Sequence, residues 1–226
     1  MKPTLSSYIR STIGEIQKKK EPGPFITISR ETGCEGYKVG DILLEMLQNT
    51  DEQKRWRLFK KEILKQLAED TGVSEEIIEE ERHAVPNLVR DFFKGMGKGT
   101  VPDGIEIRSK ITTMIRSIAI EGHAIIIGQG STAVTNDIRN GLSVRLEAPK
   151  DWRVVRVCTR DNITRDQAIA FINDQETKRA HLRRIYEQSN PRVPPFNLVF
   201  DNSTFTAEQI AQLVFKAMEQ KKMLGK

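Results

Sequence analysis

The chain has 226 residues, with 36 Lys and Arg against 31 Asp and Glu, which gives a formal charge of +5. Hydrophobic residues make up 38% and charged residues 30%, which excludes a disordered or fibrous chain. The length suits one large domain, or a core domain with an insertion. The positive charge fits an anionic partner such as a nucleotide or a phosphate ester. Aromatic residues, on which nucleic-acid domains stack bases, are only 6%, so we do not expect a nucleic-acid partner.

The sequence also argues against membrane and metal-binding classes. No apolar run approaches the roughly 18 residues that a membrane span needs. Residues 1–20 lack the continuous apolar core of a secretory signal. Cys34 and Cys158 are too few for a disulfide framework, and they are too far from the three histidines to suggest a zinc motif. We expect a cytoplasmic protein with no membrane contact and no resident metal site.

Residues 1–24 form a separate N-terminal segment. Four apolar residues at helical spacing predict a short amphipathic helix there: Leu5, Ile9, Ile13 and Ile16. Pro22 and Pro24 end this pattern. The helix either packs as a solvated arm on the core or joins two copies of the chain into a homo-oligomer.

From residue 25 onward, short apolar segments alternate with helical patterns. Five segments are predicted as buried strands: 25–29, a short one at 56–59, 123–127, 143–148 and 196–200. The helical patterns lie at 39–47, at 58–92 with a break or kink at Pro86, at 106–120, from 164 to about 186, and after 206. Four residues stand where helix N-caps are expected: Ser74, Asp103, Thr164 and Thr206. This alternation predicts an α/β fold with a five-stranded parallel sheet between helices.

Ligands of such a sheet bind at the carboxyl ends of its strands, where three glycine-rich loops compete. Loop 95–100 contains Lys98, but it follows a helical pattern instead of the strand that a phosphate loop requires. Loop 128–133 follows a strand and matches the dinucleotide pattern G-x-G-x-x-A, and Glu147 ends the next strand where a ribose-binding acid belongs. Only a short helix fits between these two strands.

The third loop, residues 29–38, is the best placed because it follows the first strand and leads into the first core helix. Its glycines permit backbone conformations that other residues avoid, and its N–H groups would form a nest for an anion. The loop lacks the strict G-x-x-x-x-G-K-[ST] pattern, so a tight turn without a ligand is the alternative. The candidate phosphate-binding residues are Arg30, Gly33, Cys34, Gly36, Tyr37 and Lys38.

Residues 26–36 resemble the start of the cytidylate kinase-like family of P-loop proteins, whose members typically read Ile-Thr-Ile-Ser-Arg-Glu, an aromatic residue, then Gly-Ser-Gly-Gly. Further blocks follow in the family's order over about residues 25–218: 59–64 with 71–76, 124–130, 148–153, 178–180 and 197–203. The resemblance implies a three-layer P-loop NTPase fold of the nucleoside monophosphate kinase type. It divides residues 25–226 into a core, a helical acceptor flap at about 57–121 and a lid at about 160–190.

The resemblance also implies a reaction, the transfer of the terminal phosphoryl group of ATP, as its Mg²⁺ complex, to a nucleoside monophosphate such as CMP. Such catalysis depends on positioning and on neutralising charge. The basic run after residue 150 suits a lid that closes on phosphates, with Arg156, Arg160 and Arg179 as the catalytic candidates. A solvated helix face with i,i+4 ion pairs is the alternative for that run. Lys98, Arg108 and Gln129 are the candidate acceptor-binding residues.

Three residues depart from the family pattern. Glu35 replaces a loop glycine, Lys60 replaces an aspartate and Gln129 replaces an arginine. A carboxylate in an anion nest repels phosphate unless it points outward, and a glutamine cannot neutralise a phosphate. A catalytically impaired kinase-fold protein that binds a nucleotide or a partner is therefore an alternative. An enzyme that uses a dinucleotide at 128–133 is another.

Overall fold

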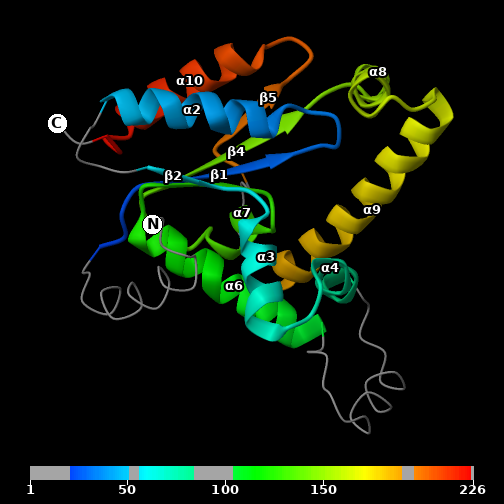
Figure 1. Cartoon of the computed structure of the whole chain (residues 1–226). Helices are drawn as coiled ribbons and strands as arrows, with labels where there is room; N and C mark the ends of the chain where they lie inside the picture. The colour runs from blue at the N-terminus through cyan, green and yellow to red at the C-terminus, as the bar shows by residue number, and fades with distance from the viewer. Residues whose placement is uncertain (1–20, 51–55, 84–103, 190–195, 225–226) are drawn as a thin grey trace, which may run out of the picture.

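The computed structural model describes residues 21–50, 56–83, 104–189 and 196–224 (Figure 1). The predicted N-terminal helix, loop 95–100, Pro86 and Asp103 lie outside these residues. No helix in the described part of the chain has the length and hydropathy needed to cross a bilayer.

The predicted α/β fold is confirmed by a five-stranded parallel sheet in the order β2-β3-β1-β4-β5. The strands are β1 (Phe25–Arg30), β2 (Arg57–Phe59), β3 (Ala124–Ile127), β4 (Gly141–Glu147) and β5 (Leu198–Asp201). Strand β1 is central, and its Ile26 pairs with Ile125 of β3 and Leu142 of β4. In dinucleotide-binding sheets the second strand lies next to the first, whereas here β3 takes that place.

Helices cover both faces of the sheet, which gives the predicted three layers (Figure 1). The helices are α2 (Gly36–Thr50), α3 (Glu62–Thr71), α4 (Glu75–His83), α6 (Gly104–Glu121), α7 (Ser131–Val134), α8 (Lys150–Asp161), α9 (Arg165–Ser189) and α10 (Ala207–Gln220). Helices α2 and α10 pack on one face, and α3 and α6 lie on the other. Helix α8 follows the carboxyl end of β4, and α9 runs back from it so that Leu182 and Tyr186 pack in the core on the α3 and α6 side.

The alternation of side chains along β1 divides the core into these two halves. Ile26 and Ile28 pack with Leu43 of α2 on one face, while Phe25 packs with Ile115 of α6 on the other. All five side chains are buried. Because both faces of the strand are covered, its first four residues, 25–28, are all buried, and three of them are apolar.

Helix ends follow the local sequence. The predicted caps at Thr164 and Thr206 are confirmed, because each threonine exchanges two hydrogen bonds with the glutamine three residues later. The predicted helical stretch 58–92 is divided earlier than expected. Its first two residues belong to β2, and Gly72 ends α3 in the left-handed conformation at φ +68°. Ser74 then accepts a hydrogen bond from the first turn of α4.

Loss of the α10 cap should destabilise the fold. We expect Thr206→Ala to lower the free energy of unfolding by about 1 kcal/mol, because the N–H group of Gln209 loses its acceptor. Thr206→Ser keeps the hydroxyl and should lose much less. Urea denaturation of both variants measures the difference, and equal stabilities would contradict the role of the cap.

Candidate functional site

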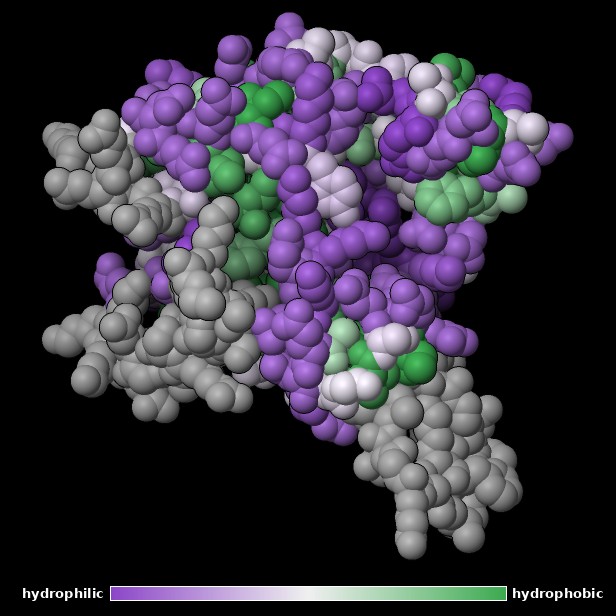
Figure 2. Space-filling view, in the orientation of Figure 1, coloured by the Kyte–Doolittle hydropathy of each residue, from purple (hydrophilic) through white to green (hydrophobic). Residues whose placement is uncertain are grey.

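Two of the three predicted loops meet at the carboxyl edge of the sheet. Because β1 and β3 pair in parallel, the chain leaves both strands side by side, and the N–H of Gly128 donates to the carbonyl of Ile28 at 2.9 Å. Both loops line one cavity of about 700 Å³, which also reaches α4 and α9. Figure 2 shows this face hollowed and surrounded by hydrophilic residues.

The charge of the cavity is strongly positive. Its lining contains eight Lys and Arg side chains against two Glu, among the residues that the structure describes. The cations are Arg30, Lys61, Arg82, Arg145, Arg160, Lys178, Arg179 and Arg183, and the acids are Glu31 and Glu79. This imbalance favours an anionic ligand with more than one negative charge.

The backbone of the first loop is partly engaged within the protein. The N–H of Cys34 donates to the carbonyl of Glu31 at 3.2 Å, and the N–H of Glu35 donates to Asn202 Oδ1 at 2.7 Å. Two N–H groups that were expected to form the anion nest therefore already have partners within the protein. Gly33 has φ +101°, and a Cβ there would lie 2.9 Å from Arg153 Cβ. Only glycine fits this approach.

Arg153 fixes the position of this loop. Its Nε donates to the carbonyl of Ala148 at 2.9 Å and lies 3.3 Å from Glu31 Oε2, and its Nη1 donates to the carbonyl of Thr32 and to Glu176. The Arg153 side chain is only 6% exposed. This arginine therefore joins the loop to α8 and α9.

Several predicted site residues lie outside the cavity lining. Arg156 pairs with Glu35 at 2.6 Å and stacks over Trp152, so the Glu35 carboxylate faces away from the cavity. Lys38 pairs with Glu208 at 2.8 Å on the exposed surface. Gly36 and Arg108 are also outside the lining. Arg30 covers Gly36, and Arg108 is buried and donates to the carbonyl of Arg82 at 3.2 Å.

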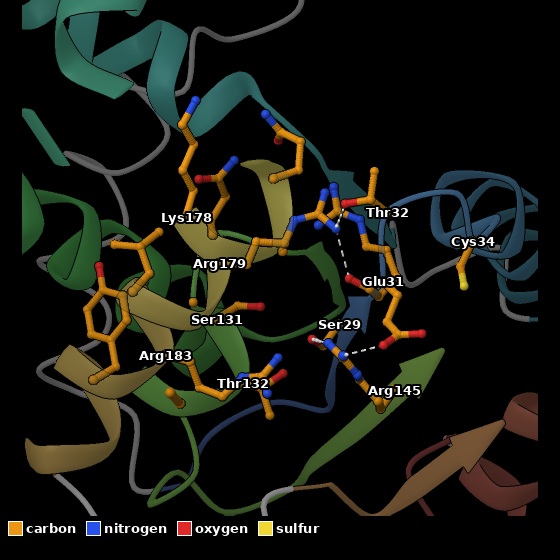
Figure 3. Close-up of a pocket in the computed structure, with 18 of the residues that line it drawn as sticks. Ser29, Glu31, Thr32, Cys34, Ser131, Thr132, Arg145, Lys178, Arg179 and Arg183 are labelled. Carbon is orange, nitrogen blue, oxygen red and sulfur yellow. Dashed lines mark hydrogen bonds and ion pairs between the residues drawn. The ribbon is translucent and has the colours of Figure 1, made fainter. Parts of the chain in front are cut away.

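Arg30 and Arg179 come together in the cavity, as Figure 3 shows for Arg179 beside Thr32. Arg179 Nη1 donates to the carbonyl of Arg30 and to Thr32 Oγ1, each at 3.0 Å. Arg30 Nη2 donates to the Tyr37 hydroxyl at 3.0 Å. Burial, together with the nearby Arg30 cation, lowers the pKa of Arg179 to about 10. Such crowding of cations is relieved by a bound anion.

The remaining predicted residues line the cavity in different ways. Arg160 lies at the rim, where it is half exposed and pairs with its neighbour Asp161 at 2.6 Å. Gln129 lines the cavity and accepts a hydrogen bond from Arg82 Nη1. Gly33, Cys34 and Tyr37 also contribute to the lining.

Two buried cations of the site were not predicted. Arg145 of β4 donates to Ser29 Oγ at 2.9 Å and faces Glu31, and its side chain is 8% exposed (Figure 3). An arginine inside a buried strand is the signal that could have identified it, since such a charge needs a partner. Arg82 follows the acidic residues 79–81 on α4, and the sequence pattern there gives no sign that it turns inward.

Comparisons with known proteins agree with this architecture. Residues 25–204 match the sequence profile of the cytidylate kinase-like family. A cytidylate kinase of Sulfolobus acidocaldarius is 28% identical in an alignment 144 residues long, which covers 60% of this chain and 79% of that protein. A cytidylate kinase of Methanocaldococcus jannaschii is 25% identical over 120 residues, covering 52% and 67% of the two chains. The crystal structure of an uncharacterized protein from Eubacterium ventriosum has the same fold, with a TM-score of 0.61 at 18% identity, covering 87% of this chain and 98% of that one.

Removal of the Arg153 guanidinium should destabilise the protein. We expect Arg153→Gln to lower the free energy of unfolding by about 3 kcal/mol, because two partly buried carboxylates lose their cation. The control is Arg165→Gln, which removes an exposed pair with Asp151 and should cost less than about 1 kcal/mol. Denaturant unfolding measures both changes. A loss at Arg153 no larger than at Arg165 would contradict the structural role.

The Cys34 thiol should be unreactive near neutral pH. Burial raises its pKa to about 11, and the Glu31 carboxylate adds to the shift. At pH 8 only about 0.1% of such a thiol is thiolate, the form that reacts with alkylating agents. In a Cys158→Ser variant we expect iodoacetamide to label Cys34 slowly, with a rate that rises through pH 10, as followed by mass spectrometry. A labelling rate that levels off near pH 9 would show an ordinary thiol.

Proposed function

Because this chain belongs to the cytidylate kinase-like family, we propose that it binds ATP and transfers the terminal phosphoryl group to a nucleoside monophosphate of the CMP type. The observation that carries the proposal is the charge of the cavity, with eight cationic side chains against two carboxylates. Phosphoryl transfer requires that kind of surrounding, since its catalysis is mostly positioning and neutralisation of phosphate charge. The names of the two archaeal relatives support the class of acceptor.

We assign the ATP phosphates to the first loop and its cations. Arg30 and Arg179 both line the cavity beside this loop, and no carboxylate is hydrogen-bonded to either guanidinium among the described residues. Arg179 comes from α9, in the predicted lid, and is the cation that we assign to the transferring phosphoryl group. Arg160 at the rim is held only by an exposed ion pair, a weak contact that a phosphate could replace.

Mg²⁺ fits this site as an ion that arrives with ATP. No group of three or more His, Cys, Asp or Glu side chains is positioned to hold a metal in the described ranges. Mg²⁺ usually binds through substrate phosphates, water and one or two carboxylates, so it needs no protein cage. Glu31 is the cavity carboxylate on the first loop. When bound, Mg²⁺ neutralises phosphate charge.

A second candidate is a kinase-fold protein that binds nucleotide without turnover. The observation that favours it is that all three residues that depart from the family pattern contact other side chains of the protein. Glu35 pairs with Arg156, Lys60 pairs with Asp41 at 2.7 Å, and Gln129 accepts from Arg82. The sheet order and the four-residue helix α7 give no support to the dinucleotide alternative.

A phosphoryl-transfer screen separates these candidates. The wild-type protein is incubated with Mg·ATP and each of CMP, UMP, AMP and GMP, and the diphosphate product is measured. We expect transfer to CMP at roughly 1–100 turnovers per second. ATP binding without transfer to any acceptor would favour the second candidate, and absence of ATP binding would reject both.

Arg179→Ala should lower kcat about 100-fold while the KM for ATP changes much less, because a cation needed in the transition state contributes little to ground-state binding. Arg184→Ala is the matched control, since Arg184 is exposed on the same helix and outside the cavity lining. Steady-state kinetics with ATP and the acceptor found in the screen give both constants. Near-wild-type kcat in Arg179→Ala would remove this residue from the catalytic assignment.

A further inference from the structure

On the side of the cavity formed by loop 128–133, a group of buried polar atoms has no hydrogen-bond partner among the described residues. They are Arg82 Nε, His83 Nδ1, Ser131 Oγ and Tyr186 OH, and all four residues line the cavity. Arg82 is 2% exposed, Ser131 1% and Tyr186 7%. A buried polar atom without a partner costs free energy, so four of them in one cavity wall indicate a site for a polar ligand.

The turn after β3 gathers these side chains. Gly128, Gln129 and Gly130 are all in the left-handed region, with φ between +62° and +75°. This conformation is unusual for a glutamine. It places Gln129 Oε1 against Arg82 Nη1, while the Tyr186 ring covers Gly130 so closely that a Cβ there would lie 2.5 Å from Tyr186 Cε2. Gln129 thus holds the Arg82 guanidinium at the turn that begins α7.

The chemistry of this wall favours an anion. The Arg82 guanidinium can only donate hydrogen bonds, and the serine and tyrosine hydroxyls can donate as well. The carboxylate that Arg82 contacts is Glu79, at 3.2 Å, and this glutamate is 47% exposed and shared with His83. An oxygen-rich anion such as a phosphate monoester would accept from Arg82 Nε and from the hydroxyls.

We propose that Arg82 binds the phosphate group of the acceptor nucleotide, and that Gln129 is the residue that positions it. The inference rests on the proposed function, which assigns the first loop to ATP. Arg82 comes from α4, on the other side of the cavity and within the segment 57–121 predicted as the acceptor flap. A cation supplied by α4 therefore gives the acceptor side the charge that a glutamine at position 129 lacks.

The test compares CMP with cytidine, which lacks the phosphate. Isothermal titration is carried out with the protein saturated by a non-hydrolysable ATP analogue. Wild type should bind CMP at least about 30-fold more tightly than cytidine, as expected for a charge-assisted phosphate contact. Arg82→Gln should remove most of that ratio, while the affinities for cytidine and for the ATP analogue stay within about twofold.

Matched variants control for structural effects. Arg116→Gln removes the same charge from α6, where the arginine pairs with Asp137 outside the cavity, and should keep the CMP-to-cytidine ratio. Gln129→Glu keeps a partner for Arg82 and so protects the fold if Arg82→Gln fails to fold. Its carboxylate neutralises Arg82 and should lower CMP affinity about 10-fold without affecting cytidine.

The outcomes are separable from those of the proposed function. Three results would overturn the role of Arg82. The wild type could bind CMP no more tightly than cytidine, or Arg82→Gln could weaken the binding of CMP and cytidine equally. The third is a CMP-to-cytidine affinity ratio that stays unchanged in both Arg82→Gln and Gln129→Glu. Transfer to CMP with an unchanged ratio in Arg82→Gln would reject this inference and leave the phosphotransferase in place. Phosphate-dependent CMP binding that Arg82→Gln removes, without any transfer, would support the inference and reject the catalysis.

Discussion

The shape of the site depends on one buried arginine. Arg153 donates to the carbonyl groups of Thr32 and Ala148 and pairs with Glu31 and Glu176, so three segments of chain share a single guanidinium. Burial of such a cation is expensive unless its donors are satisfied, and here several acceptors offset the cost. The same arrangement brings the loop so close to α8 that position 33 accommodates no side chain.

This packing leaves side chains, more than the backbone, to make the cavity positive. Since the N–H groups of Cys34 and Glu35 are already engaged, the positive potential of the cavity comes mainly from guanidinium groups on separate elements. Arg30 belongs to β1, Arg145 to β4 and Arg179 to α9. Burial and the neighbouring cations lower the pKa values of Arg30 and Arg179, and an anion in the cavity would offset the repulsion between the cations.

Ion pairs between residues of different elements explain which parts of the site the sequence could not predict. Apolar, β-branched segments determine the strands because both faces of this sheet are buried, so the sheet and the loop after β1 were predictable. Arg156 and Arg160, which lie on one helix with Arg153, were expected to act together with Arg179. The structure instead turns Arg153 inward, pairs Arg156 with Glu35 and leaves Arg160 at the rim. Helical spacing predicts on which face of its own helix a residue lies. It does not predict which acidic side chains from other elements lie opposite that residue.

The replacement of the family's arginine by Gln129 likewise depends on a residue from another element. In the sequence alone, Gln129 looks like the loss of a cation, because it is uncharged and replaces the arginine of the family pattern. In the folded protein its side chain binds the guanidinium of Arg82, a residue 47 positions away on α4. An arginine at 129 would place two cations within hydrogen-bonding distance in a buried wall, so Gln129 and Arg82 are compatible while two arginines would repel. The charge of a binding site is set by the sum over the elements that meet there, and a substitution at one position can be offset by a side chain from another element.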